Sequence, residues 1–158
     1  SGGPPMLNVL YNNNYQIVQS PSYVMIMVEM NHDARIIRLN SEFNPDNMRR
    51  WLGDSIGSWE GNTLVVKTKN HHPQQKFRAA IRHQILISEG AEITERFTRV
   101  GENEILYQFE VNDDEAYKDV WKGEMPLRAS QERIYEYACH EGNYAMANIL
   151  AGARAEEE

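Results

Sequence analysis

The chain has 158 residues, a length that fits one domain with a buried core. Its 41% hydrophobic and 25% charged residues are typical of a globular protein. The 23 acidic and 16 basic residues give a net charge of -7. This balance argues against nucleic acid or an anionic membrane surface as the partner, because both attract clustered positive charge. No stretch of about 18 apolar residues occurs, so membrane insertion is not expected.

The two ends of the chain and its single cysteine set further limits. Residues 1–6, SGGPPM, have the composition of a tag remnant or a disordered start. The closing glutamates 156–158 are expected to fray, because anions are disfavoured at a helix C-terminus. Cys139 is the only cysteine, which excludes an intrachain disulfide and a cysteine-based metal cluster. The whole chain is therefore expected to form a single domain.

Most of the chain consists of short β-rich runs separated by turn residues. The candidate strands are residues 15–19, 23–30, 34–39, 57–60, 63–69, 76–87, 92–100, 104–111, 119–127 and 133–139. The pair Gly61-Asn62 is a strong signal for a two-residue hairpin. Strand 23–30 is apolar on both faces and is predicted to be buried on both sides. The short connections predict an all-β, mainly antiparallel meander of about eight to ten strands, closed as a barrel or folded as a sandwich.

Two helices are predicted to interrupt the strands. In residues 44–53, Asn44 is a candidate N-cap, Pro45 suits the first helical position, and Gly53 marks the end. In residues 143–155, apolar residues recur at helical spacing after a candidate cap at the first position.

Alternation along the strands places carboxylates on otherwise apolar faces. Glu95 lies between Ile93 and Phe97 on one face of its strand. Glu29 and Glu136 also share a face with apolar neighbours. Because burying an unpaired carboxylate is unfavourable, each of these glutamates requires a polar partner or a function.

Four stretches resemble a large family of bacterial proteins that are mostly exported and have no established activity. They are WLG at 51–53, SIGSWEGNTLVVKT at 55–68, ERFTR at 95–99 and EYACHEGN at 136–143, in the order that is typical of the family. The resemblance covers nearly the whole chain. It implies a β-rich, lipocalin-like barrel and a periplasmic or secreted location, but no particular reaction. Residues 67–77, KTKNHHPQQKF, depart from the family pattern and are expected to reshape a pocket.

Motifs for metal or nucleophilic chemistry are weak. The histidines are His32, His71, His72, His83 and His140, and none has the spacing of a common metal motif. A rim site of His32, His140 and a glutamate is the alternative, but ordinary hydrogen-bonding roles are favoured, so neither a metal nor a cofactor is predicted. On a strand, Cys139 and His140 would point apart, which favours a structural cysteine over a nucleophile.

General acid–base catalysis is the enzyme chemistry that the residue types allow best. The candidate catalytic residues are Glu29, His32, Arg35, Glu95 and Glu136. The candidate ligand-binding residues are Tyr23, Met25, Met27, Phe97, Trp121, Tyr137 and His140. In the alternative interpretation, Glu95 and Glu136 form buried ion pairs with Arg35, Arg38 or Arg96. For each glutamate taken singly, this structural role is favoured.

The stretch IYEYACHEGNY, residues 134–144, concentrates reactive side chains near the end of the chain. Its simplest interpretation is a last strand, a turn and a helix cap. The alternative is a site that includes Glu136, His140 or Glu141.

These features lead to three hypotheses about function. The first is a cofactor-free lyase, isomerase or cyclase that acts on a small apolar or aromatic molecule in the barrel lumen. The alternative is a non-catalytic, lipocalin-like carrier in the bacterial periplasm. The third is a structural protein that associates through exposed strand edges, and a homo-oligomer is compatible with each hypothesis.

Overall fold

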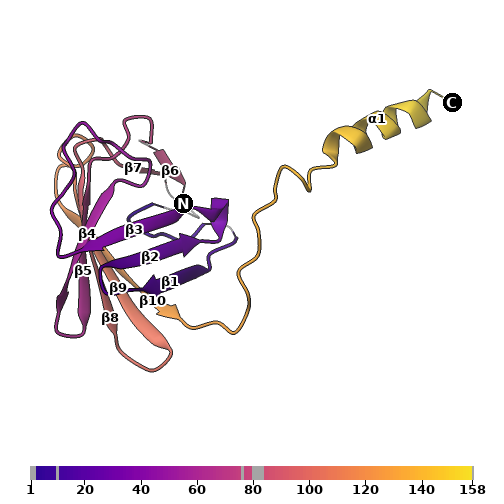
Figure 1. The fold of residues 1–158 in the computed structure, drawn as a ribbon. Coiled ribbons are helices and arrows are strands. Elements are labelled where there is room, and N and C mark those ends of the chain that lie inside the picture. The colour runs from indigo at the N-terminus through magenta and orange to yellow at the C-terminus, as the bar shows by residue number, and fades with distance from the viewer. Residues whose placement is uncertain (1–2, 10, 76, 80–83, 158) are drawn as a thin grey trace.

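The computed structural model describes residues 3–9, 11–75, 77–79 and 84–157. Its strands are β1 (Tyr15–Gln19), β2 (Tyr23–Val28), β3 (Ala34–Leu39), β4 (Asp54–Glu60), β5 (Thr63–Lys69), β6 (Phe77–Ala79), β7 (Gln84–Leu86), β8 (Glu92–Arg99), β9 (Glu104–Asn112) and β10 (Trp121–Arg128). Its helices are the short η1 (Met30–His32) and the C-terminal α1 (Ala145–Glu156). Figure 1 shows the strands gathered in one body and α1 standing away from it.

Eight strands form one curled sheet in the order β1-β2-β3-β4-β5-β8-β9-β10, and β6 pairs with β7 in a separate hairpin. All neighbours are antiparallel except β3 and β4, which are parallel because the loop 40–53 returns the chain to the upper end of the sheet before β4 begins. Among the described residues β1 and β10 pair with no further strand, so the sheet is a half-barrel. The predicted β-rich, barrel-like class is confirmed, with a curled half-barrel in place of a fully closed barrel.

Local signals located several strands well. β1, β3 and β5 begin and end at the predicted residues. The β4–β5 hairpin turns where predicted, with Glu60 opposite Thr63 and Gly61 at a φ of 58°, a conformation that glycine adopts without strain. The single strand predicted at 76–87 is instead two short strands, and residues 76 and 80–83 within it lie outside the described residues.

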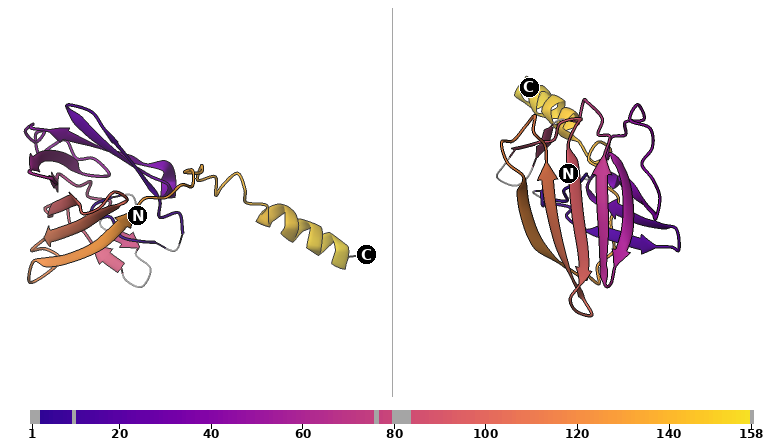
Figure 2. Two further views of the ribbon diagram at one scale, coloured as in Figure 1. Left: turned by 90° about the horizontal axis from the view of Figure 1, so that it is seen from below. Right: turned by 90° about the vertical axis from the view of Figure 1, so that its left-hand side faces the viewer.

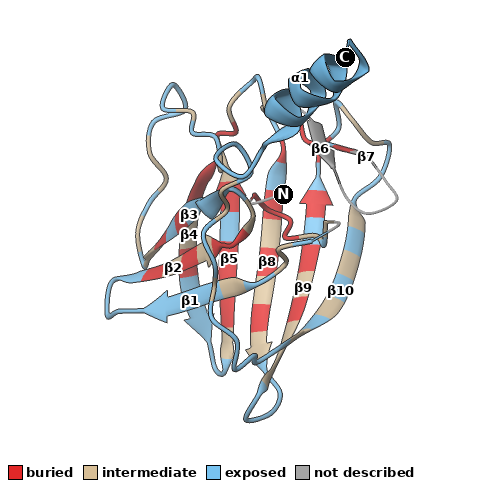
Figure 3. Ribbon diagram, turned by 90° about the vertical axis from the view of Figure 1, so that its right-hand side faces the viewer, coloured by how far each residue is buried: buried red, intermediate tan, exposed pale blue. Residues whose placement is uncertain are grey.

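The core lies on the concave face of the half-barrel. The strand residues that point inward include Val24, Ile37, Val66, Ile93 and Tyr107, all nearly inaccessible to solvent. No second layer covers the convex face within the described ranges, which leaves Tyr23 of β2 49% exposed and Met25 and Met27 half-buried. The prediction that this strand is buried on both sides is therefore wrong. Figure 3 shows buried residues alternating with more accessible ones along β5, β8 and β9.

The N-terminal segment fills part of the space that the sheet encloses. Residues 3–6 are buried, and Met6 packs in the core with 1% of its surface exposed. The Met6 backbone N–H donates a hydrogen bond of 2.8 Å to the hydroxyl of Tyr107. The expectation of a disordered start is therefore wrong for residues 3–6, because this apolar stretch occupies a surface that the half-barrel would otherwise leave open.

The helix predicted at 44–53 is absent, and the segment forms a loop over the upper end of the sheet. It contains two isolated turns, closed by hydrogen bonds from the Met48 N–H to Pro45 and from the Gly53 N–H to Arg50. Asn44, the predicted N-cap, makes other contacts: its backbone N–H and its side-chain amide both donate to the Asp54 carboxylate, at 2.6 and 2.9 Å. Further along, Arg50 pairs with His71 in an isolated β-bridge. These tertiary contacts hold the segment extended and override its helical signals.

At the C-terminal end one prediction is confirmed and one is wrong. The helix predicted at 143–155 is α1, and the side chain of Asn143 accepts a hydrogen bond of 3.1 Å from the N–H of Ala145. The strand predicted at 133–139 does not form, because the segment runs along the open side of the half-barrel without pairing to either edge. Figure 2 shows this segment leading away from the sheet to α1.

Candidate functional site

A buried ionic cluster lies at the centre of the concave face. Arg35 on β3 donates two hydrogen bonds to Glu95 on β8, at 2.6 and 3.2 Å. The Tyr107 hydroxyl on β9 donates a third to the same carboxylate, at 2.8 Å. Glu95 is fully inaccessible and Arg35 is 3% exposed. We call Arg35, Glu95, Tyr107 and the Met6 backbone N–H the buried ionic cluster.

The cluster shifts the pKa values of the tyrosines around it. Burial raises the pKa of Tyr107 well above its ordinary value, and the negative charge of Glu95 raises it further. Burial also raises the pKa of Tyr15 on β1, where the opposing charges of Arg35 and Glu95 partly cancel. Both hydroxyls therefore stay protonated at neutral pH, and neither is an available base.

The chemistry open to this cluster is limited. Both oxygens of Glu95 already accept hydrogen bonds, and its surroundings leave no surface for a substrate to reach. A general base must lie within hydrogen-bond reach of the proton that it abstracts. The arrangement therefore fits a structural ion pair, the alternative that the sequence offered for Glu95 with Arg35 as its partner.

Glu29 has a different task at the end of β2. Its carboxylate accepts hydrogen bonds from the Asn14 side chain at 2.8 Å and from the Tyr135 backbone N–H at 3.2 Å. Two residues further on, hydrogen bonds with Tyr11 and then with Cys139 raise the pKa of Tyr137 to about 12. The contacts of Tyr135 with Glu29 and of Tyr137 with Tyr11 link this part of the C-terminal segment to the body. Glu29 is thus an anchor for the C-terminal segment.

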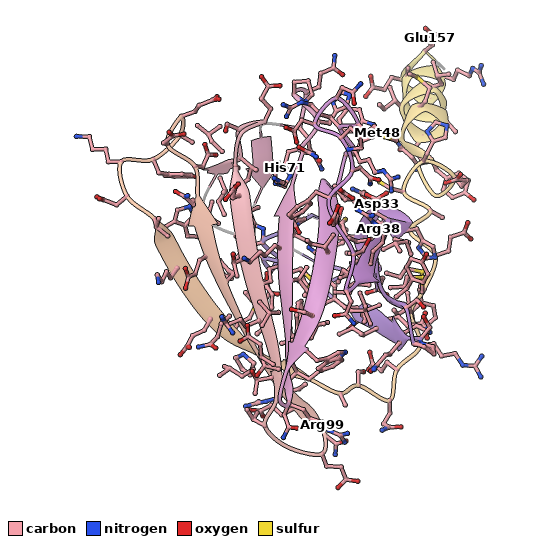
Figure 4. The ribbon with its side chains drawn as sticks, turned by 60° about the vertical axis from the view of Figure 1, so that its left-hand side comes forward. Asp33, Arg38, Met48, His71, Arg99 and Glu157 are labelled. Carbon is pink, nitrogen blue, oxygen red and sulfur yellow. The ribbon has the colours of Figure 1, made fainter. Side chains whose placement is uncertain are left out.

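An apolar pocket opens at the lower end of the half-barrel, on the concave side. Its volume is about 170 Å³. Its walls are the buried side chains of Val24, Ile26, Leu64 and Phe97, together with Ile17 and Ile105, while Gln19, Trp59, Asn62 and Arg99 contribute the polar and aromatic remainder. We call this space the lower pocket. Figure 4 shows Arg99 at the end of the sheet opposite His71 and Met48.

A larger groove runs between the free edges of the sheet. Its volume is about 650 Å³, and it lies between β1, the lower part of β10, the turn after β8 and the segment that follows β10. We call it the side groove. Ile17, Arg99 and Ile105 belong to both spaces, so the lower pocket and the side groove share a wall. Asn8, Asn13 and Asn14 make the groove more polar than the pocket.

The predicted site residues do not converge on one place. Glu95 and Arg35 meet in the buried cluster, Glu29 anchors the C-terminal segment, and His32 and Glu136 are exposed. The ion pair foreseen as an alternative for Glu136 is not formed.

The predicted ligand-binding residues are dispersed in the same way. Phe97 lines the lower pocket, whereas Trp121 packs edge-on against Phe109 with ring centroids 5.3 Å apart. Tyr23, Met25 and Met27 lie on the convex face, and Tyr137 and His140 belong to the C-terminal segment. The pocket residues that were not predicted include Ile17, Trp59, Leu64, Arg99 and Ile105. Alternation identifies them as inward-pointing, but only the curl of the sheet brings β1 opposite β8 and β9.

The described part of the chain offers little support for a metal site or a membrane-spanning helix. No group of three His, Cys, Asp or Glu side chains there is arranged to hold a metal ion. None of the helices within the described ranges has the length and apolar character needed to cross a membrane. Cys139 is exposed.

Comparisons with known proteins add no assignment: no family model matches the chain, and neither curated proteins nor solved structures give a match. The resemblance to exported bacterial proteins thus stays a prediction from motifs.

Proposed function

We propose that the protein is a non-catalytic binding protein for a small amphipathic molecule, in the manner of a lipocalin. The observation that carries this proposal is the lower pocket and the side groove that shares its wall. An apolar cavity of about 150 Å³ is sufficient for one benzene ring, so the lower pocket suits one ring or a short branched alkyl group. The groove has a volume typical of small-molecule sites and would hold the polar remainder.

The positions of the carboxylates favour a carrier over an enzyme. A carrier requires apolar walls, with its charged groups either paired or outside the pocket. Glu95 is paired, Glu29 is engaged by Asn14 and the C-terminal segment, and Glu136 is exposed. An acid–base enzyme would require one of them at the wall of the lower pocket, which they do not line. The proposed lyase or isomerase activity therefore has less support than ligand carriage.

The proposal is tested by blocking the junction between pocket and groove. Anilinonaphthalene sulfonate, which carries apolar rings and an anionic group, is the probe, and its own emission is the readout. Ile105→Trp places a bulky ring at the shared wall and is expected to weaken binding of the probe about tenfold or more, which corresponds to about 1.4 kcal/mol. The matched control is Ile56→Trp, because Ile56 is half-buried on β4 and lines neither space.

Thermal unfolding of each variant shows whether the fold is retained. Equal binding of the probe by the wild type and by a folded Ile105→Trp variant would overturn the proposal. A second measurement addresses the natural ligand: the protein is purified without denaturant, extracted with organic solvent, and the extract is analysed by mass spectrometry. An amphipathic compound is expected from the wild type and not from the blocked variant.

A further inference from the structure

The C-terminal helix has an apolar side that nothing covers. All residues of α1 are exposed, including Met146 at 68%, Ile149 at 64% and Leu150 at 48%. With Ala153 they follow a spacing of three and four residues, which places them on one side of the helix. Figure 1 and the left view of Figure 2 show α1 clear of the sheet.

A helix of this kind is not expected to persist alone in water. It has 12 residues, and isolated helices shorter than about 12 to 15 residues are marginal. Tyr144, at the N-cap position, provides no side-chain capping bond. Packing of the apolar side against another surface would supply the missing stabilisation. The stability of α1 therefore depends on which surface covers its apolar side.

The convex face of β1, β2 and β3 carries a matching apolar surface. Val18 lies directly opposite Met25, and Met25 lies directly opposite Ile36, so the three form a row across the strands. Val18 and Ile36 are 45% and 46% exposed. Tyr23 and Met27 extend the row along β2. We call Val18, Tyr23, Met25, Met27 and Ile36 the outer apolar patch. The Cα atoms of these residues span about 13 Å along the strand and about 10 Å across the strands, and their side chains extend the surface further, so the patch is comparable in size to one side of a helix.

Charge and geometry restrict what could cover α1. A membrane-surface helix is typically rich in Lys and Arg, whereas Arg154 is the single Lys or Arg of α1, and the helix ends in Glu156 with Glu157 directly after it. Two turn hydrogen bonds precede α1: the N–H of Gly142 donates to Ala138 and the N–H of Asn143 donates to His140. These turns direct α1 away from its own body. A second copy of the chain carries the same outer apolar patch, so it offers α1 a surface of matching character.

We propose that the protein forms a dimer in which α1 of each copy packs on the outer apolar patch of the other. Half the lateral surface of a helix about 18 Å long and about 11 Å wide is about 310 Å². Reciprocal exchange covers two helix sides and two patches, about 1,200 Å² in total, which reaches the lower limit for a stable interface. A single one-way contact covers about half as much, so the exchange has to be mutual.

The dimer is independent of the lower pocket and can be tested without a ligand. Sedimentation equilibrium of the full chain is expected to give twice the 18.3 kDa of one chain. Leu150→Asp on α1 and Ile36→Glu on the patch are each expected to weaken the dimer at least a hundredfold. The controls Asn148→Asp, on the opposite side of α1, and Ser58→Asp, exposed on the convex face outside the patch, are expected to leave the dimer intact.

Complementation between two monomeric variants distinguishes exchange from folding back. Ile36→Glu and Leu150→Lys are each expected to be monomeric, while a mixture of the two is expected to form a heterodimer. The heterodimer has one native contact and one contact between the two substituted positions, where the charges are opposite. A helix folded onto its own body would not show this behaviour. The proposal is overturned by a monomeric wild type, by a dimer that survives Leu150→Asp, or by a mixture that stays monomeric.

Discussion

The central and lower parts of the concave face are built from the same strands but are filled differently. At the centre, Glu95 is surrounded by Arg35, Tyr107 and the N-terminal segment, and no space remains. Two residues along β8, Phe97 faces a pocket of about 170 Å³. The same alternation of inward-pointing side chains therefore leads to a sealed region and to an open one.

The difference follows from what each region buries. A carboxylate inside a protein requires partners for both oxygens, and those partners occupy the space around it. Apolar side chains need no hydrogen-bond partners, so a space can remain open beside them. An apolar group of a ligand gains free energy when it enters that space. A charge on the wall of a lumen is thus weak evidence for a reaction when its partners also come from the wall. The open, mainly apolar part of the same lumen is the better place to look for a ligand.

The largest expected effect comes from neutralising the buried carboxylate. Glu95→Gln leaves the Arg35 charge buried without its counter-ion and is expected to lower the free energy of unfolding by about 3 to 5 kcal/mol. Urea denaturation followed by circular dichroism measures it. The control is Glu60→Gln, because Glu60 pairs with Arg96 at 2.9 Å while both side chains are largely exposed. Loss of this pair is expected to change stability by about 0.2 to 1 kcal/mol.

The opposite outcome would restore the enzyme hypothesis. If Glu95→Gln were as stable as the wild type, the buried pair would not hold the centre of the fold together. A catalytic carboxylate is often held at the expense of stability, so its neutralisation is expected to be neutral or stabilising. The comparison of Glu95 with Glu60 therefore separates a structural role from a functional one.

The amount that could be predicted from the sequence differs between these regions. Glu95 was expected to be buried because Ile93 and Phe97 flank it, and Arg35 was among its expected partners. Tyr107 was missed as the second partner of Glu95, because alternation places a tyrosine on a face without stating what its hydroxyl reaches. The helix prediction at 44–53 was wrong for a similar reason. Asn is a common N-cap residue, but Asn44 donates its hydrogen bonds to Asp54, ten residues away.

The lower pocket was beyond the reach of local patterns. Ile17 and Ile105 each point inward on their own strand, yet they belong to strands on different sides of the half-barrel. Their meeting depends on the curl of the sheet and on the parallel pairing of β3 with β4, which short connections do not reveal. The segment predicted as a strand at 133–139 had the right composition, but the Tyr135 N–H donates to the Glu29 side chain and the segment pairs with neither β1 nor β10.

A second prediction tests the hydroxyl that joins the buried cluster to the N-terminal segment. Tyr107→Phe removes a donor to Glu95 and an acceptor for the Met6 N–H, and is expected to lower the free energy of unfolding by about 1 to 3 kcal/mol. Tyr23→Phe is the control, since Tyr23 is 49% exposed on the convex face. A change below that of the control would show that the cluster does not depend on Tyr107.

The same variant has an effect on pH dependence. The pKa of Tyr107 is higher in the folded than in the unfolded protein, so the folded state holds this proton more tightly. Its contribution is fully present below the unfolded pKa of about 10 and is lost as the pH rises above it. Tyr107→Phe is therefore expected to make the loss of stability above about pH 10 less steep, with Tyr15 responsible for part of the remainder.

The smallest expected effect on stability is at the wall of the lower pocket. Ile17 is 40% exposed, so Ile17→Ala is expected to change the free energy of unfolding by about 0.5 kcal/mol. The matched substitution in the sealed region is Ile37→Ala, because Ile37 is fully buried, and there about 2 to 5 kcal/mol is expected. Binding of anilinonaphthalene sulfonate should weaken with Ile17→Ala, because the apolar wall recedes, and should be unchanged in any folded Ile37→Ala protein. If Ile17→Ala instead destabilises the fold as much as Ile37→Ala does, the lower lumen belongs to the core, and the ligand site has to be sought elsewhere along the side groove.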